Sequence, residues 1–215
     1  MKIYKIGIIG CGGIAQKMAA TLEKMKGVER YAVASRNQEK AEAFANKWGF
    51  TKAYGSYEEL ASDPEVDLIY IATPHAMHYD NAHMCIEKGK PVLCEKAFTA
   101  NARQAEDLLA FAKEKGVFIT EAIWTRYMPL SLKIQELLKE GVIGTPYTLS
   151  ANLSYPISNK ERIIRPELAG GALLDIGVYT LNFAAMAFGS DIAETHSVCQ
   201  KTQTGVDAQE SITLF

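Results

Sequence analysis

Glu95 and Lys96 place an acid beside a base at the end of the apolar run Val92-Leu93-Cys94. Removing charges from water is costly unless they are compensated, so a buried strand rarely continues through such a pair. Taken alone, the pair is compatible with a solvated loop. A lysine that follows a strand can also serve chemistry, because its cation stabilises a neighbouring anion such as a phenolate.

A glycine-rich turn lies near the start of the chain, where Gly10-Cys11-Gly12-Gly13-Ile14-Ala15 fits G-x-G-x-x-G/A. Gly10 permits the tight turn, Gly12 lets the backbone approach a ligand, and Ala15 allows close packing of helix on strand. The helix N-terminus attracts negative charge. The turn therefore predicts that Gly10, Gly12, Gly13 and Ile14 bind the pyrophosphate of a dinucleotide.

The end of the second predicted strand reads Ala34-Ser35-Arg36-Asn37 and has no carboxylate for the ribose 2′-hydroxyl that NAD carries. Ser35 can donate to a 2′-phosphate, and Arg36 can pair with that phosphate or stack on adenine. These two residues favour NADP, with NAD as a possibility. The alternative is a solvated arginine at the start of a helix.

The elements that must position these residues alternate between short apolar runs and amphipathic ones. This alternation predicts an α/β fold, a doubly wound parallel Rossmann sheet with helices on both faces. The expected strands are Ile3–Ile9, Tyr31–Ser35, Leu68–Thr73, Val92–Cys94 and Val117–Glu121. The expected helices are Ala15–Lys26, Gln38–Trp48, one starting at the capping box Ser56 to Glu59, and one from Asn101 to Lys115.

The pattern changes after about Trp124, so we expect a Rossmann domain at 1–122 and a second, α+β domain at 123–215 with a mostly antiparallel open sheet. Its expected elements are a helix, a strand, a polar loop, a long apolar helix opened by Gly170-Gly171, and two more strands. The elements other than the apolar helix span Ser131–Glu140, Tyr147–Tyr155, Ser158–Arg165, Ile192–Lys201 and Glu210–Phe215. The last strand pattern stops without a polar tail, so this substrate and dimerisation domain is expected to be incomplete.

Composition narrows the function classes. The formal net charge of −2 gives no electrostatic reason to expect nucleic acid or an anionic membrane as a partner. The four cysteines are scattered, which favours a reduced compartment, and neither a signal peptide nor an apolar run long enough to span a bilayer is expected. We therefore predict a cytoplasmic protein.

These motifs together resemble those of the Gfo/Idh/MocA oxidoreductase family. The resemblance runs along the chain through GIIGCGGIA, ATPHAMHYD, CEKAF and GGALLDIGVY. EAIWTRYMP and Ser35-Arg36 are most like the dimeric dihydrodiol dehydrogenase and NADP-dependent xylose dehydrogenase branch. Membership implies hydride transfer between NADP and a sugar or cyclic trans-diol hydroxyl, and a homodimer or higher homo-oligomer formed through the C-terminal sheet.

The resemblance also implies roles for individual residues. Lys96 matches the lysine of the family's EKP motif, Tyr179 stands where many members have a catalytic His, and Asp175 matches the Asp one helical turn earlier. A lysine cation ~4 Å from a phenol contributes about 4 kcal/mol at an effective dielectric of ~20, which lowers the phenol pKa by up to roughly three. Lys96 and Tyr179 are therefore expected to form a general-base pair. Ala97 replaces the family's usual Pro, so the loop after Lys96 is expected to be less fixed.

The remaining expected cofactor contacts follow the strands. The resemblance places His75 and His78 along the nicotinamide side. Thr73 and Pro74, in the same loop, are expected to bind the cofactor, and Glu95 is expected to bond the ribose or carboxamide. Trp124, with Arg126 and Tyr127, is a candidate for packing on the nicotinamide. The equally weighted alternative is that these residues only join the two domains. A metal site is not expected, because His75, His78 and His83 lack the convergent partners that a ligand set needs.

Two other functions remain open at this point. One is a sugar oxidoreductase that keeps its cofactor bound and cycles it between two substrates. The other is a truncated, inactive relative that binds NADP and acts as a sensor or oligomer partner.

Overall fold

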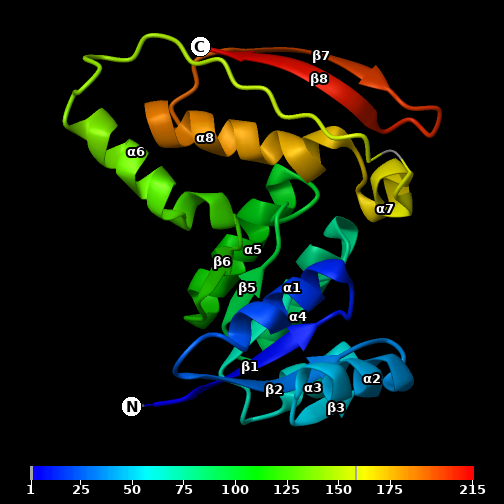
Figure 1. Cartoon of the computed structure of the whole chain (residues 1–215). Coiled ribbons are helices and arrows are strands. Elements are labelled where there is room, and N and C mark those ends of the chain that lie inside the picture. The colour runs from blue at the N-terminus through cyan, green and yellow to red at the C-terminus, as the bar shows by residue number, and fades with distance from the viewer. Residues whose placement is uncertain (1, 158) are drawn as a thin grey trace. The chain divides into compact units, whose positions relative to one another are not determined.

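The computed structural model describes residues 2–157 and 159–215, and its contacts divide the chain into two compact units, Met1–Ala122 and Ile123–Phe215. The first unit contains a six-stranded parallel sheet, and the second contains helices and a two-stranded antiparallel sheet (Figure 1). The predicted α/β fold class is confirmed.

The sheet of the first unit runs in the order β3-β2-β1-β4-β5-β6. Its order reverses between β1 and β4, and ligands of such sheets bind outside the carboxyl ends of the strands at this switch point. The five predicted strands are present, and the three-residue β3 was not predicted. The strands are β1 (Tyr4–Ile9), β2 (Val28–Ala34), β3 (Lys52–Tyr54), β4 (Leu68–Ile71), β5 (Val92–Cys94) and β6 (Ile119–Glu121).

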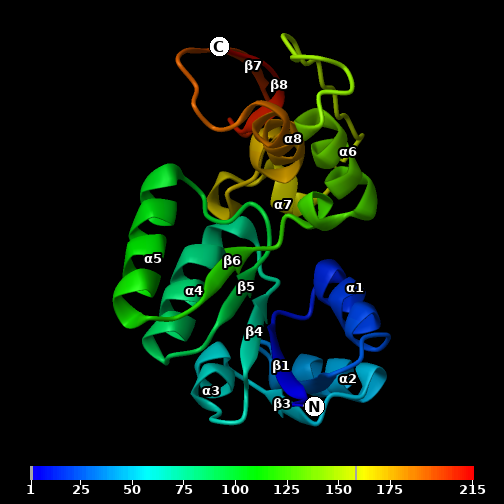
Figure 2. The same cartoon turned by 90° about the vertical axis from the view of Figure 1, so that its left-hand side faces the viewer.

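Helices cover both faces of this sheet, as Figure 2 shows. One face packs on two helices and the other on three. They are α1 (Gly13–Leu22) and α2 (Gln38–Trp48) on the first face, and α3 (Tyr57–Ser62), α4 (His78–Glu87) and α5 (Ala102–Lys115) on the second. Successive strand residues alternate between the faces, so Ile8 joins the core under α1 while Ile9 joins the core under α4.

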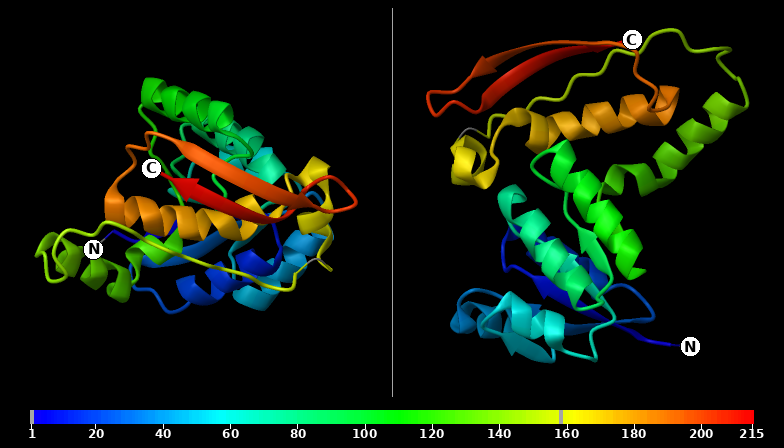
Figure 3. Two further views of the ribbon diagram at one scale, coloured as in Figure 1. Left: turned by 90° about the horizontal axis from the view of Figure 1, so that it is seen from above. Right: turned by 180° about the vertical axis from the view of Figure 1, so that it is seen from behind.

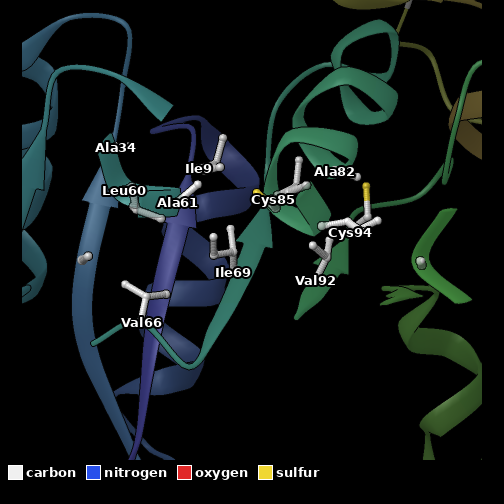
Figure 4. Packing of buried hydrophobic residues seen from close by; sticks show 14 of the residues in the cluster. Ile9, Ala34, Leu60, Ala61, Val66, Ile69, Ala82, Cys85, Val92 and Cys94 are labelled. Atoms are coloured by element: carbon white, nitrogen blue, oxygen red, sulfur yellow. The ribbon is translucent and has the colours of Figure 1, made fainter. Parts of the chain in front are cut away.

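The core beneath α3, α4 and α5 is built mostly from small and β-branched side chains, together with Tyr31, Leu60 and Leu108 (Figure 4). Ile69 and Val92 are fully buried in it, and each such side chain stabilises the fold by ~2 kcal/mol. Cys85 and Cys94 are equally buried, and burial raises the pKa of Cys85 to about 12. These two thiols therefore act as small apolar groups that are poor nucleophiles.

Helix ends in this unit follow from single polar residues and glycines. The side chains of Ser56 and Asn101 accept hydrogen bonds from the amides of Glu59 and Gln104, at 3.2 and 3.1 Å, as their spacing predicted. Gly116 ends α5 in a left-handed conformation (φ +64°), which glycine adopts without strain.

The second unit begins with a 3₁₀ turn at Trp124–Tyr127 and contains one long composite helix. A π-helical turn, Leu173–Gly177, leads directly into α8 (Val178–Phe188). The β7–β8 hairpin lies beside this helix (Figure 3), and Asp207 of β8 accepts a hydrogen bond from the amide of Leu173 at 2.6 Å. The other elements are α6 (Pro129–Lys139), α7 (Glu161–Ile164), β7 (Thr195–Lys201) and β8 (Asp207–Leu214).

Two expectations for this unit are wrong. Tyr147–Tyr155 was expected to be a strand, but it forms none, and Tyr147 is 89% exposed. Its weak alternation is not enough, since a strand needs a paired neighbour and β7 and β8 pair with each other. The expected polar loop Ser158–Arg165 contains α7; residue 158 lies outside the described residues.

The expectation about membrane spans also needs correction. The helical stretch Pro166–Phe188 has a mean hydropathy of 1.4 and is long and apolar enough to cross a bilayer by length and composition. A single helix of this kind is weak evidence for a span, because core helices of water-soluble proteins pass the same test. None of the residues of α8 is buried in this structure.

Candidate active site

The glycine turn forms an open cradle at the start of α1. Gly10 has φ +98°, and a Cβ there would lie 2.9 Å from the carbonyl oxygen of Ala72, so a side chain is excluded. A Cβ on Gly13 would meet nothing within 4 Å, and the N-cap residue Gly12 has no side chain to cap the first turn. Gly12, Gly13 and Ile14 are exposed, while Ala15 is fully buried against the sheet. These residues fit a dinucleotide pyrophosphate, because uncapped amides and the helix dipole favour an anion.

The residues expected to contact the 2′-substituent of the cofactor's ribose, Ser35 and Arg36, follow β2. Ser35 is buried, and its hydroxyl accepts a long hydrogen bond of 3.4 Å from the amide of Asn37. Arg36 is exposed beside Tyr57 at the start of α3. Burial raises the pKa of Tyr57, and the Arg36 guanidinium opposes that rise. The two side chains therefore form a cationic, aromatic corner next to the glycine turn.

A further cation near this turn was missed by the sequence reasoning. Lys40, in the first turn of α2, lines a surface hollow together with Cys11, Gln16 and Lys47. Burial raises the pKa of the Cys11 thiol, while the Ser35 hydroxyl and the Lys40 ammonium oppose the rise. The signal in the sequence was a lysine in the first turn of the helix that follows Arg36.

Four residues expected to contact the cofactor, Thr73, Pro74, His75 and His78, follow β4. Their side chains differ in burial and in hydrogen-bond partners. Thr73 is buried and its hydroxyl accepts from Asn81 at 3.1 Å, while Pro74 is half-buried. His75 is 8% exposed and packs edge-on against His78, with 5.7 Å between ring centroids.

His78 itself is a correction to the expected cofactor contact. Its ring has no exposed surface, and its nitrogens lie 2.7 and 2.9 Å from the carbonyl oxygens of Ala97 and Thr73. Burial lowers the pKa of His78; the two carbonyls oppose this, and the Lys96 charge adds to it. Because the polar atoms of the ring are used inside the fold, His78 has no surface with which to contact a cofactor.

Glu95 and Lys96 follow β5, at the same edge of the sheet. Glu95 is 8% exposed, and its carboxylate accepts hydrogen bonds from the hydroxyl of Tyr70 and, at 3.3 Å, from the Lys96 amide. Burial raises the pKa of Glu95, while the Tyr70 hydroxyl and the Lys96 charge oppose the rise. Lys96 is half-buried, and the Lys96–Ala97 peptide bond is cis.

In the second unit, Asp175 lies in the π-helical turn and is almost completely buried. Its carboxylate pairs with the guanidinium of Arg162, at 2.7 Å for the shorter contact. Arg162 lies in the segment expected to be a polar loop, where a charged side chain is usually solvated. The carboxylate of Asp207 holds the first turn of this helix, where it accepts from the Leu173 amide.

Close neighbours explain the glycine pair that opens this helix: Asp207 for Gly171, and the backbone of Ile163 for Gly170. A Cβ on Gly171 would lie 2.0 Å from a carboxylate oxygen of Asp207, and Gly171 has φ +118°. A Cβ on Gly170 would lie 2.4 Å from the carbonyl oxygen of Ile163. Both positions need glycine, because the chain before and β8 approach the helix start too closely for any side chain.

Tyr179, in the first turn of α8, is tied to Trp124. The indole N–H donates to the Tyr179 hydroxyl oxygen at 3.2 Å, and the rings meet edge to face with centroids 6.4 Å apart. A hydrogen bond donated to the hydroxyl oxygen favours the phenolate. Arg126 likewise donates to the side-chain oxygen of Asn182, one turn further along α8. The structure thus brings Trp124 to a residue of the expected acid–base pair.

Comparison with known proteins identifies the chain. Residues 4–122 match the model of an oxidoreductase family with an NAD-binding Rossmann fold, and residues 131–215 match the Gfo/Idh/MocA C-terminal domain. The chain belongs to the Gfo/Idh/MocA oxidoreductase family. The resemblance predicted from the motifs is therefore confirmed.

The Gfo/Idh/MocA chain is similar to two dehydrogenases and to a 3-ketoreductase of known structure. The trans-1,2-dihydrobenzene-1,2-diol dehydrogenase of Xenopus tropicalis is 40% identical over 98% of the chain and 64% of its own length. The NADP⁺-dependent D-xylose 1-dehydrogenase of Hypocrea jecorina is 44% identical over 83% of the chain and 51% of its own length. A solved 3-ketoreductase of Actinomadura kijaniata with NADP is 30% identical, with a TM-score of 0.86 over 99% of the chain and 65% of that protein. The chain thus spans between 51% and 65% of the length of these three relatives.

Proposed function

We propose that the protein is an NADP-dependent oxidoreductase that transfers hydride between NADP and a hydroxyl group of a sugar or a cyclic trans-diol. The named relatives, a diol dehydrogenase and a xylose dehydrogenase, support this substrate class. The observation that carries the chemistry is the hydrogen bond from Trp124 to the Tyr179 hydroxyl, because it favours the form of tyrosine that accepts a proton.

Each half of the chain has its own task in this proposal. The open first turn of α1 binds the pyrophosphate, and Ser35 and Arg36, helped by Lys40, bind the 2′-phosphate. Glu95 and Lys96 orient the ribose, with Thr73, Pro74 and His75 near the nicotinamide, which supplies the hydride acceptor when bound. NAD remains a weaker second cofactor, since no carboxylate follows β2.

The proton of the substrate hydroxyl is handled by side chains of the protein. We assign Tyr179 as the general base in alcohol oxidation and Lys96 as the cation that lowers the tyrosine pKa, as the family motifs imply. Asp175 orients a substrate hydroxyl, and Arg162 holds its buried carboxylate through their 2.7 Å contact. Trp124 serves as a donor to the Tyr179 oxygen and as part of the substrate pocket.

Substituting the base tests the chemistry. Tyr179→Phe should abolish turnover of a panel of sugars and trans-diols while the Kd for NADPH, read by its fluorescence, stays within about twofold. Tyr147→Phe is the matched control, because that hydroxyl is on an 89% exposed side chain. Retained turnover in Tyr179→Phe would assign the base elsewhere. NADPH binding by the parent protein without turnover on any substrate would favour the sensor function instead.

Cofactor choice is tested at Arg36. Arg36→Ala should weaken NADP binding by about tenfold or more and leave NAD binding nearly unchanged, because only NADP carries the 2′-phosphate. Arg103→Ala, an exposed arginine on α5, is the control. An unchanged ratio of the NADP and NAD affinities would show that Arg36 does not determine the preference for NADP.

We also propose that the protein forms a homodimer or higher homo-oligomer through its C-terminal sheet, is cytoplasmic, and has no nucleic-acid or membrane partner. The strand β7 supports the first point, since all of its residues are exposed and Val198 is 72% exposed. Val198→Lys should shift the mass measured by light scattering toward the monomer, whereas an unchanged mass would exclude this surface as the interface.

A further inference from the structure

The side chain of His78 contacts the backbone of two loops, which follow the neighbouring strands β4 and β5. His78 is the first residue of α4, and its ring lies between the carbonyl oxygen of Thr73, after β4, and that of Ala97, after β5. Strands β4 and β5 are parallel neighbours paired through Ile71 and Cys94. The ring therefore bridges the backbone at the carboxyl edge of the sheet, where the dinucleotide of the proposed function would lie.

The bridge reaches the residue next to Lys96. On one side of Ala97, the Lys96 amide donates to Glu95, whose carboxylate is in turn held by Tyr70. On the other side, the Phe98 amide donates to a carboxylate oxygen of Glu121 at 2.9 Å. His78 fixes the carbonyl between these two anchors, at 2.7 Å. The contacts thus hold consecutive residues of the short segment from which the Lys96 side chain projects.

We propose that His78 is a positioning residue that holds the Ala97 carbonyl and thereby sets the backbone that carries Lys96. The inference rests on the proposed function for its consequence in catalysis, but its geometry lies wholly within the first unit. A misplacement of a reacting group by about 1 Å can cost on the order of 10²-fold in rate. The loss of this bridge should therefore lower kcat rather than weaken cofactor binding.

A neutral imidazole has one N–H, which we place on Nδ1 toward the nearer carbonyl oxygen, that of Ala97. Two substitutions separate the contacts of the two ring nitrogens. In His78→Asn the amide nitrogen occupies a place like that of Nδ1 and can still donate to Ala97. In His78→Gln the amide nitrogen reaches the place of Nε2 and can donate to Thr73 instead. His83→Asn and His83→Gln are matched controls on the same helix, where the ring stacks on Phe111 at 4.1 Å between centroids.

Steady-state kinetics with NADP and the best substrate of the parent protein give the first readout. His78→Asn should keep kcat within about threefold of the parent, and His78→Gln should lower it by about tenfold or more, with KM for NADP within twofold in both. Equal effects of the two substitutions, or a raised KM for NADP with unchanged kcat, would overturn the proposal, since the latter indicates direct contact with the cofactor.

Hydrogen exchange gives a readout that needs neither cofactor nor substrate. The Phe98 amide should exchange about tenfold faster in His78→Gln than in the parent and nearly at the parental rate in His78→Asn, whereas the Ile69 amide in β4 should not change. Unchanged exchange at Phe98 in His78→Gln would also overturn the proposal. A parent protein that turns over no substrate refutes the proposed function alone, and Phe98 exchange still decides the role of His78.

The His78→Gln protein is not indispensable to the test. If it does not fold, His78→Asn decides by itself, because it retains the donor to Ala97. Parental kcat and Phe98 exchange in the folded His78→Asn protein would support the proposal, and loss of either would overturn it.

Discussion

Glu210 offers a quantitative test of the second unit, because its charge is unfavourable in the folded state. Its carboxylate, on β8, faces the π-helical turn at Gly177 and lies near Asp207. Burial and the neighbouring Asp207 raise the pKa of Glu210 from 4.5 to about 7. Folding therefore favours the protonated carboxyl, and the stability that this contributes is present below pH 4.5 and is lost as the pH rises through about 7.

Glu210→Gln replaces the protonated carboxyl by a neutral group of nearly the same shape. A rise from 4.5 to about 7 corresponds to roughly 3 kcal/mol at 1.36 kcal/mol per pKa unit. Partial exposure of Glu210 screens the charge, so we expect a gain of about 1–3 kcal/mol in the free energy of unfolding at pH 8 and almost none at pH 4. In a chain of this size the gain raises Tm by roughly 3–10 °C.

Thermal unfolding followed by circular dichroism at pH 4, 6 and 8 measures this gain directly. Asp191→Asn, at an exposed carboxylate of the same unit, is the control and should change Tm little at any pH. A Glu210→Gln protein that is equally stabilised at pH 4 and pH 8, or is destabilised at pH 8, would refute the argument that Asp207 and Glu210 cannot both be charged without cost.

Three further outcomes follow from buried polar contacts. Asp63→Asn should lower the free energy of unfolding by about 2 kcal/mol at pH 7 and hardly at all near pH 2. Hydrogen bonds from Tyr54, Lys52 and the Glu65 amide outweigh the burial of the Asp63 carboxylate and lower its pKa from 3.8 to about 2. Urea unfolding at both pH values checks this. Tyr70→Phe should raise the pKa of Glu95 further, seen by carboxyl NMR, and cost about 1–3 kcal/mol of stability. Arg162→Ala should cost about 2–4 kcal/mol in urea unfolding, because it removes the guanidinium from the buried carboxylate of Asp175, whereas Arg162→Lys should recover part of this.

Local sequence determined most of the first unit. Apolar strands of fixed length, capping residues such as Ser56 and Asn101, and the glycine turn all act within a few residues of one another. Their physical effects therefore need no knowledge of the rest of the chain, and the predicted strands, helix starts and parallel sheet are present. The same locality made the turn at Gly10 interpretable as an anion cradle. β3 and α4 escaped, since Lys52–Tyr54 is not a continuously apolar run and no side chain caps the start of α4.

The tertiary structure decided what the polar side chains do. The sequence placed His78 at a cofactor and left Arg162 without a role, yet the fold buries His78 between the carbonyls of Thr73 and Ala97 and pairs Arg162 with Asp175. These partners lie 5 to 19 residues away along the chain. Whether a donor meets a carbonyl, a carboxylate or solvent depends on which loops the sheet and helices bring together, and spacing along the chain does not contain that information.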